Sequence, residues 1–356
     1  MDYYGYARVP EKIDHIKYGR FRNVYLYITE KCHLNCGHCY LGERLERGIT
    51  MPLDQVIRNL ILWRKMGGSK LSILGGEPTL HPNFEEIIQY ANKLGYEKVI
   101  LNTHALRSAI NKIQLINSSD FSYVQVSLDG ASSKTHDRIR GKGTFDISWE
   151  GTKKLCDLGF DTRIICTVNR INIDECFELL PMADEIGASL VKFHVFSGIG
   201  NGNENEDWLV SPPEWIEFYE KLESYKNKYK ARIWYQPTYA KIEKMNQYSL
   251  EGYSGCIGRT LDRISIFPDG KAYVCSYLFD TELNYLFVNG DSIETNKNYN
   301  EFELFTKPLI KDSCGSCKIS SVCMGGCPAE KVVMGESSCI SHEDIVPVCR
   351  LWKSDI

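Results

Sequence analysis

Three cysteines with a fixed spacing are the residues of this chain most suited to chemistry. Cys32, Cys36 and Cys39 directly follow the stretch 23–29, which predicts a β-strand. A cubane 4Fe-4S cluster normally takes four protein thiolates. A loop with three therefore leaves one iron free to bind a chelating substrate or cofactor. The alternative is a zinc loop, because cysteines two to four residues apart also bind zinc.

A second motif follows further along the chain. A short apolar stretch predicts a buried strand, and it ends in Gly75, Gly76, Glu77 and Pro78. Two glycines let the backbone approach a ligand closely, and a carboxylate beside them can accept hydrogen bonds from an ammonium group. Alone, these four residues would be an ordinary boundary between a strand and a turn. Their position after the cysteine triplet favours a shared site.

Together, the cysteine triplet and Gly75 to Pro78 resemble the cluster loop and the GGEP motif of the radical S-adenosylmethionine (radical SAM) superfamily. The resemblance implies that Cys32, Cys36 and Cys39 hold a 4Fe-4S cluster and that Glu77 binds the methionyl amine. It also implies an activity: reductive cleavage of S-adenosylmethionine to a 5'-deoxyadenosyl radical, which removes a hydrogen atom from a substrate C–H bond. A flavodoxin or ferredoxin would supply the low-potential electron.

A second group of cysteines lies near the C-terminus. Four of them form a C-x2-C-x5-C-x3-C run, with Cys256 and Cys275 before it and Cys349 after it. This pattern resembles the SPASM domain, an extension of radical SAM enzymes that carries two auxiliary 4Fe-4S clusters. The resemblance implies Cys256, Cys275 and Cys327 as ligands of the inner cluster, and Cys314, Cys317, Cys323 and Cys349 as ligands of the outer one. A disulfide or zinc-ribbon module is the alternative.

The inner auxiliary cluster is left with three predicted ligands. Some relatives supply a fourth cysteine just after the first, but residues 258–263 contain none. The inner cluster therefore either keeps an open iron or takes Cys339. Either Cys339 or Cys349 could also be the distal ligand of the outer cluster, and the resemblance favours Cys349.

Five further residues are candidate contacts of the cofactor. A hydroxyl or carboxylate at Ser127 and Asp129 would suit ribose hydroxyls, although Asp129 also fits a plain turn. The resemblance places Asn102 and Arg140 near the cofactor, with Arg140 beside its carboxylate. His38 stands where the family usually has an aromatic residue beside the adenine, so we expect its ring to pack rather than titrate.

Strand and helix signals alternate through the middle of the chain, which predicts an α/β fold with a parallel sheet. The expected strands are 24–29, 71–74, 98–101, 123–128, 162–168 and 190–196, and the expected helices are 52–65, 83–94, 144–158, 174–186 and 212–229. The resemblance implies a partial (β/α)6 barrel. Functional residues of such folds lie at the carboxyl ends of strands, where both motifs are found.

Four segments are expected along the chain. They are an N-terminal extension (1–20), the radical SAM barrel (21–235), a bridge (236–255) and the SPASM auxiliary-cluster domain (256–356). The last segment contains an expected β-hairpin at 263–275, whose Pro268-Asp-Gly270 is a turn signal.

Composition is that of a soluble cytoplasmic protein. Hydrophobic residues make up 43% of the chain and charged residues 25%, and the formal charge is −4. The sequence has neither an apolar run long enough to span a membrane nor a signal peptide. Fourteen cysteines without a secretion signal argue against a disulfide framework. Near-neutral charge also argues against nucleic-acid binding, and the short basic stretch 226–232 fits a solvated helix end.

The substrate is the least determined part of the prediction. The resemblance disfavours sulfatase maturation, because Ser276 follows Cys275 where those enzymes carry an aspartate. Only 31 residues precede Cys32, too few for an N-terminal peptide-recognition domain, which argues against a leader-dependent peptide maturase unless a standalone protein recognises the peptide. We favour oxidative modification of a ribosomal peptide. A dehydrogenase of a small polyol or aminocyclitol in natural-product biosynthesis is the alternative, and a non-catalytic iron–sulfur electron-transfer protein is a third.

Overall fold

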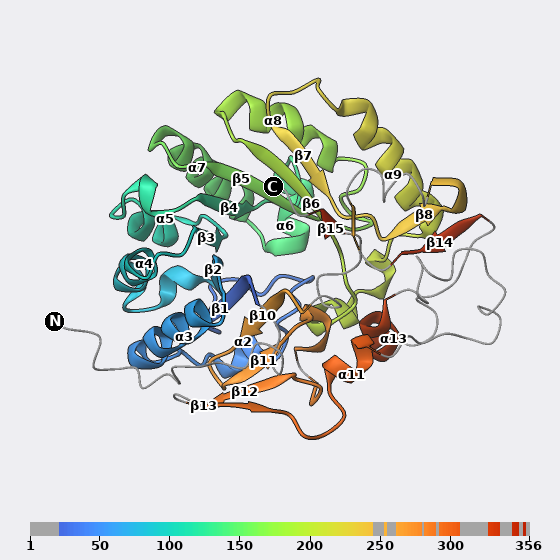
Figure 1. The fold of residues 1–356 in the computed structure, drawn as a ribbon. Coiled ribbons are helices and arrows are strands. Elements are labelled where there is room, and N and C mark those ends of the chain that lie inside the picture. Colours follow the sequence, from blue (N-terminus) through green and yellow to red (C-terminus); the bar gives the residue numbers. More distant parts are fainter. Residues whose placement is uncertain are drawn as a thin grey trace.

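A large curved sheet forms the centre of the molecule. The computed structural model describes residues 21–244, 253–254, 261–279, 281–289, 292–306, 327–334, 344–348 and 352–353. Within these residues an 11-stranded sheet has the order β13-β12-β11-β10-β1-β2-β3-β4-β5-β6-β7. Figure 1 shows this sheet curving around an interior, with the helices packed mainly on its outer side.

Seven strands of the sheet run parallel in chain order. They are β1 (Asn23–Thr29), β2 (Lys70–Gly75), β3 (Lys98–Thr103), β4 (Tyr123–Ser127), β5 (Thr162–Val168), β6 (Leu190–Val195) and β7 (Arg232–Tyr235). The six strands expected from the sequence are confirmed. The structure adds β7, a strand of four residues that pairs with β6.

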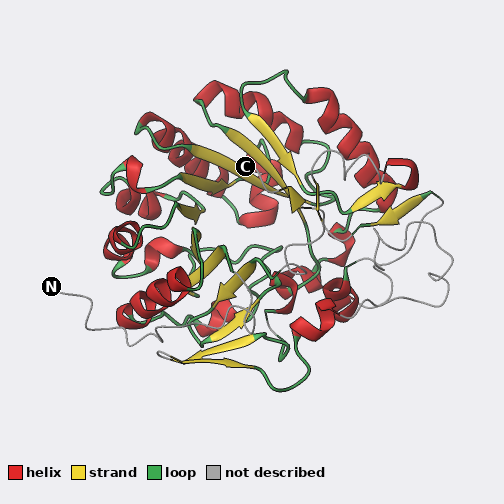
Figure 2. Ribbon diagram, in the orientation of Figure 1, coloured by secondary structure: helices red, strands yellow, loops and turns green. Residues whose placement is uncertain are grey.

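Helices alternate with these strands and cover the outer face of the sheet (Figure 2). They are α3 (Leu53–Lys65), α4 (Phe84–Lys93), α5 (Arg107–Ile113), α7 (Thr144–Asp157), α8 (Leu179–Ile186) and α9 (Pro212–Tyr225). The helix expected at 174–186 begins only at Leu179, after a short 3-10 turn. Helix α9 begins sharply because Ser211 and Glu214 form a capping box and Pro212 occupies its first position.

The C-terminal part continues the same sheet. Strands β10 (Arg263–Ile266) and β11 (Lys271–Tyr273) form the expected hairpin, and β12 (Leu286–Asn289) and β13 (Ser292–Thr295) extend it. Gly270 adopts a φ of 80° at the turn, a conformation that favours glycine. Strand β10 pairs in parallel with β1. The hairpin is therefore joined to the barrel through the backbone, an arrangement that the sequence did not predict.

The remaining described elements are short. They are α2 (Arg44–Arg47), α6 (Ser133–Arg140), α11 (Glu301–Thr306), α13 (Pro328–Met334), β8 (Tyr239–Lys241), β9 (Tyr253–Ser254), β14 (Ile345–Pro347) and β15 (Trp352–Lys353). Strand β8 pairs with β14, and β9 pairs with β15. No helix among the described residues is long and apolar enough to cross a membrane.

Strand alternation separates the core from the interior. On β1, Val24, Leu26 and Ile28 are buried in the main apolar cluster, which lies between sheet and helices. Tyr25 and Tyr27, the alternate residues, face the interior. The same two-residue period holds on the neighbouring strands, so the sheet presents one apolar face to the helices and one mixed face to the inside.

Candidate active site

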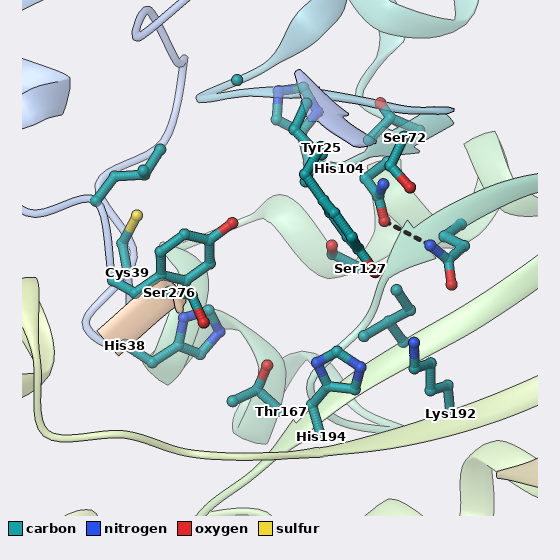
Figure 3. A pocket seen from close by; sticks show the side chains of 18 of the residues that line it. Tyr25, His38, Cys39, Ser72, His104, Ser127, Thr167, Lys192, His194 and Ser276 are labelled. Atoms are coloured by element: carbon teal, nitrogen blue, oxygen red, sulfur yellow. Dashed lines mark hydrogen bonds between the residues drawn. The ribbon is translucent and has the colours of Figure 1, made fainter. Parts of the chain in front are cut away.

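The inner face of the sheet lines a cavity of about 350 Å³. Figure 3 shows side chains from opposite walls pointing into it, with Cys39 and His38 on one side and Lys192 and His194 on the other. Cys32, Cys36 and Cys39 all line the cavity. The cysteine loop follows the carboxyl end of β1, where residues that act on ligands gather in folds of this kind.

Gly75 and Gly76 hold one side of the cysteine loop. A Cβ atom on Gly75 would lie 2.4 Å from the carbonyl oxygen of Thr29, and one on Gly76 would lie 2.5 Å from that of Lys31. Both distances are far shorter than a van der Waals contact, so a larger residue would push the loop away. The close approach expected of these glycines is made to the cysteine loop itself.

A second loop, residues 199–205, holds the opposite side. The side chain of Asn201 donates to the carbonyl oxygen of Cys36 at 2.9 Å, and its backbone N–H donates to that of Cys39 at 2.9 Å. Asn205 donates to the carbonyl oxygen of Gly37 at 3.0 Å. The sequence prediction missed these residues. A Gly- and Asn-rich run directly after a strand is the signal that could have found them.

Hydrogen-bond donors near the thiols suit them to bind an iron–sulfur cluster. The N–H of Leu34 donates to the Cys32 sulfur at 3.4 Å, and the backbone of Leu41 bonds Cys39. Such donors stabilise thiolates bound to iron. Burial raises the pKa of Cys32 to about 12 and that of Cys39 to about 11, so metal binding must displace a proton from each.

Single-ion sites are a separate question. In the described part of the chain, no three His, Cys, Asp or Glu side chains are placed to hold one metal ion. A cubane cluster makes a different demand, since its thiolates bind different irons.

Glu77 is buried and takes its hydrogen bonds from the protein. Thr79 Oγ1 donates to its carboxylate at 2.8 Å, Thr103 Oγ1 at 2.9 Å and the N–H of His104 at 3.0 Å. The carboxylate therefore connects the ends of β2 and β3. It does not line the cavity, and neither does Pro78, the buried first residue of the following 3-10 helix. Binding of the methionyl amine by Glu77 stays a prediction.

Asp129 gathers two of the other candidates and one backbone N–H around its buried carboxylate. His38 Nε2 and Arg140 Nε each lie 2.5 Å from its Oδ2, and the N–H of Thr167 donates to its Oδ1 at 2.7 Å. Burial alone would raise the pKa of Asp129, but the charges of Arg140 and His38 outweigh it and hold that pKa below its usual range. The ring of His38, which we expected to pack beside the adenine, hydrogen-bonds this carboxylate.

The candidates differ in whether they reach the cavity. His38, Arg140, Ser127 and Asn102 line it, whereas Asp129 lies behind them. The side-chain oxygen of Asn102 accepts a hydrogen bond of 2.7 Å from Gln125 on the neighbouring strand. The structure thus brings most of the predicted cofactor contacts to one cavity, with Asp129 as the group that orients two of them.

Two predicted ligands of the inner auxiliary cluster lie in a second apolar cluster, beside the cavity. Cys327 is buried there, and Cys275 and Cys39 pack against it. The carboxylate of Glu301 accepts hydrogen bonds from the N–H groups of Val274 and Cys275. The other predicted auxiliary ligands and the alternative lie outside the described residues: Cys256, Cys314, Cys317, Cys323, Cys349 and Cys339.

A buried arginine connects the cysteine loop to the hairpin. Arg44, on α2, lies 3.2 Å from Glu30 and 3.0 Å from Asp269 in the hairpin turn. Its guanidinium also donates to the carbonyl oxygen of Phe279 at 2.7 Å and stacks on the ring of Phe267. These contacts, which we call the Arg44 clamp, fix the position of the hairpin relative to the loop that carries the three cysteines.

Comparisons with known proteins agree with this site. Residues 26–181 match the model of the Radical SAM superfamily. The chain is 26% identical over 323 residues to mycofactocin maturase MftC of Mycobacterium tuberculosis H37Rv, covering 86% of this chain and 78% of the relative. It is 28% identical over 327 residues to the AdoMet-dependent heme synthase of Methanosarcina barkeri, covering 84% and 88%. The chain therefore contains a radical SAM domain and is an enzyme.

A solved structure shows the same fold. Streptococcus suis SuiB, bound to its precursor peptide SuiA, superposes with a TM-score of 0.71 at 17% sequence identity. The match covers 89% of this chain and 75% of SuiB. The mostly parallel, curved sheet is therefore the partial barrel of radical SAM enzymes.

Proposed function

We propose that this enzyme oxidatively modifies a peptide by hydrogen-atom abstraction. The observation that carries the proposal is the convergence of Cys32, Cys36 and Cys39 with the Gly75-Gly76 turn in the lining of a cavity large enough for a side chain. Two comparisons support a peptide substrate. MftC is named a maturase, and SuiB was solved with a precursor peptide.

In this proposal the three cysteines hold a 4Fe-4S cluster that binds S-adenosylmethionine. When bound, the pair supplies a 5'-deoxyadenosyl radical by reductive cleavage. The chain provides the positioning and the exclusion of water. His38 and Arg140, held by Asp129, line the cofactor side of the cavity together with Asn102 and Ser127.

The proposal includes two auxiliary clusters in a SPASM domain. Cys275 and Cys327 lie in one apolar cluster with Cys39, which supports an inner cluster close to the first. Cys256 would complete its three ligands, and the outer cluster would take Cys314, Cys317, Cys323 and Cys349. A substrate radical must lose an electron to become an oxidised product, and an auxiliary cluster at this place could accept it. A flavodoxin or ferredoxin is the proposed external donor.

The test begins with anaerobic reconstitution and quantification of iron, sulfide and 5'-deoxyadenosine. We expect about twelve irons per chain, and 5'-deoxyadenosine after addition of dithionite and S-adenosylmethionine. Replacing Cys32, Cys36 and Cys39 by alanine should abolish 5'-deoxyadenosine and remove about four irons. Cys156→Ala is the matched control, because Cys156 belongs to no predicted ligand set. Fewer than about eight irons in the unmodified protein would contradict the three-cluster assignment.

A small-molecule substrate is the second candidate. A cavity of about 350 Å³ falls within the range typical of small-molecule sites, which fits a dehydrogenase of a polyol or aminocyclitol. Genetic context separates the two candidates. A neighbouring gene for a short precursor peptide, whose product becomes lighter by two hydrogens or cross-linked when incubated with the enzyme, supports the first, and turnover of a polyol supports the second.

A further inference from the structure

The charged groups that line the cavity are all of one sign. Among the described residues that line it there is no aspartate and no glutamate. The cationic side chains that line it are Lys70, Arg140, Arg163, Lys192 and Arg263. An excess of buried positive charge is unfavourable unless a negative group arrives to compensate it.

The partners of these cations show where the excess lies. Arg140 is paired with Asp129, and Arg163 is paired with Asp161 at 3.0 Å. The Nε atoms of Arg163 and Arg263 are buried without a hydrogen-bond partner among the described residues. Nor does any acceptor in this part of the chain bond the ammonium group of Lys192.

Aromatic rings hold three of these cations against the cavity wall. The Arg163 guanidinium lies 3.6 Å from the ring centroid of Tyr123, and the Arg263 guanidinium lies 4.3 Å from that of Tyr25. The Lys192 ammonium lies 4.3 Å from the ring centroid of Trp234. Such contacts place a cation without neutralising it. Lys192 and Arg263 therefore remain able to bind an anion, and Arg163, although paired with Asp161, keeps a buried Nε–H without a hydrogen-bond partner among the described residues.

Lys192 enters the cavity at the level of a predicted cofactor contact. In the sheet, Ser127 pairs with Ile165, and Ile165 pairs with Lys192. Figure 3 shows Lys192 pointing into the cavity beside His194 and across from Cys39. A group bound by Lys192 would therefore lie inside the barrel, facing the side on which the three cysteines are found.

The surroundings of Lys192 favour loss of its proton. Burial, with added repulsion from Arg263 and Arg163, lowers its pKa to about 7. The other groups that face it are Trp234 on β7 and His194 on its own strand. An anion bound between Lys192 and the two arginines would raise that pKa again, because it would favour the charged form.

We propose that Lys192, Arg163 and Arg263 bind an oxyanion of the substrate, a carboxylate, inside the barrel. The identification of that group as a carboxylate of a peptide, from a side chain or from the C-terminal residue, rests on the proposed function. The existence of the site does not. The carboxylate anchors the substrate on the barrel wall and leaves the adjoining C–H bonds facing the cofactor side of the cavity.

The test is competitive labelling of the reconstituted holoenzyme with trace acetic anhydride, read for each lysine by mass spectrometry. At pH 7 Lys192 should react at least ~10-fold faster than exposed Lys112, since far more of it is neutral. Acetate should slow the labelling of Lys192 at least ~3-fold. Acetamide, the neutral isostere, should not slow it. Arg163→Gln and Arg263→Gln should each weaken the protection by acetate.

Three results would overturn the proposal. If Lys192 were labelled at the same rate as Lys112, its ammonium group would not be unpaired. If acetate and acetamide protected it equally, the site would not recognise negative charge. If inorganic phosphate protected Lys192 more strongly than acetate, the proposed carboxylate ligand would be wrong, and the site would be assigned to a phosphate group. The control variant Lys112→Met should leave Lys192 labelling unchanged. Because no readout uses S-adenosylmethionine, failure of the site and failure of the proposed function are separate results.

Discussion

Arg140 and Lys192 face the same cavity but have opposite surroundings. Arg140 bonds a buried carboxylate, Asp129, which also bonds His38. Lys192 lies among two arginines and a tryptophan ring, with no acceptor in the described part of the chain. A charge that is already compensated serves to fix the structure around it, whereas an uncompensated one costs stability and is retained where a ligand supplies its partner. The protein itself supplies the negative partner of Arg140, whereas the partner of Lys192 comes from the bound substrate.

The largest expected effect comes from removing the carboxylate that compensates Arg140. Asp129→Asn removes the anion between His38 and Arg140 and leaves the Arg140 charge buried beside Cys36. We expect a loss of about 3 kcal/mol of stability and poorer iron retention by the cysteine loop. Thermal melting and iron analysis of the reconstituted protein measure both. The exposed Asp157→Asn is the matched control, and equal melting of the two variants would contradict the assigned role.

A smaller change in stability, of opposite sign, is expected when the uncompensated charge of Lys192 is removed. Lys192→Met replaces a buried ammonium by a side chain of similar length, so the ligand-free protein should gain about 2 kcal/mol at pH 6. The folded-state pKa lies below the unfolded value, so the destabilisation by lysine is complete below about pH 7 and fades as the pH rises toward about 10.5. The gain should therefore shrink between these values. Melting curves at pH 6 and pH 9 test this, and a gain that grows with pH would exclude an unpaired ammonium.

The smallest effect is expected at the Arg44 clamp, whose cation is paired with carboxylates as Arg140 is. Asp269 is 19% exposed, and Glu30 remains when it is changed. Asp269→Asn should therefore cost only about 1 kcal/mol. Melting of this variant beside the exposed Asp146→Asn measures the difference. A loss as large as that of Asp129→Asn would mean that Arg44 depends on the hairpin turn rather than on Glu30.

Much of the fold could be predicted because its signals are local. Six strands and the longer helices follow from runs of apolar residues bounded by turns, and the first helix expected, 52–65, is found at Leu53–Lys65. Strand β7 was missed because four residues carry little pattern of their own. Its place is decided by pairing with β6 across the intervening α9. The pairing of β10 with β1 is likewise a tertiary choice that no local segment determines.

The site divides in the same way. The cysteine triplet and Gly75-Gly76 are contiguous motifs, so the sequence could place them together. Lys192 lies inside an expected strand, and the sequence alone indicates only a lysine on the solvent-exposed face of that strand. Only closure of the sheet turns that face inward. Asn201 was missed for a related reason, because its partner, the cysteine loop, lies far away in the sequence although close in space.

The Arg44 clamp has a consequence for synthesis of the chain. The three cysteines leave the ribosome well before the hairpin does, because Arg44 and its acceptor, the Phe279 carbonyl, are separated by 235 positions. Translation at about 5–20 residues per second places tens of seconds between them. During that interval β1 can pair with β2 but not yet with β10, so the surroundings of the thiols are incomplete. The proposed cluster would therefore meet its complete protein surroundings only after the hairpin has been made, and we expect the free thiols to need protection from oxygen until then.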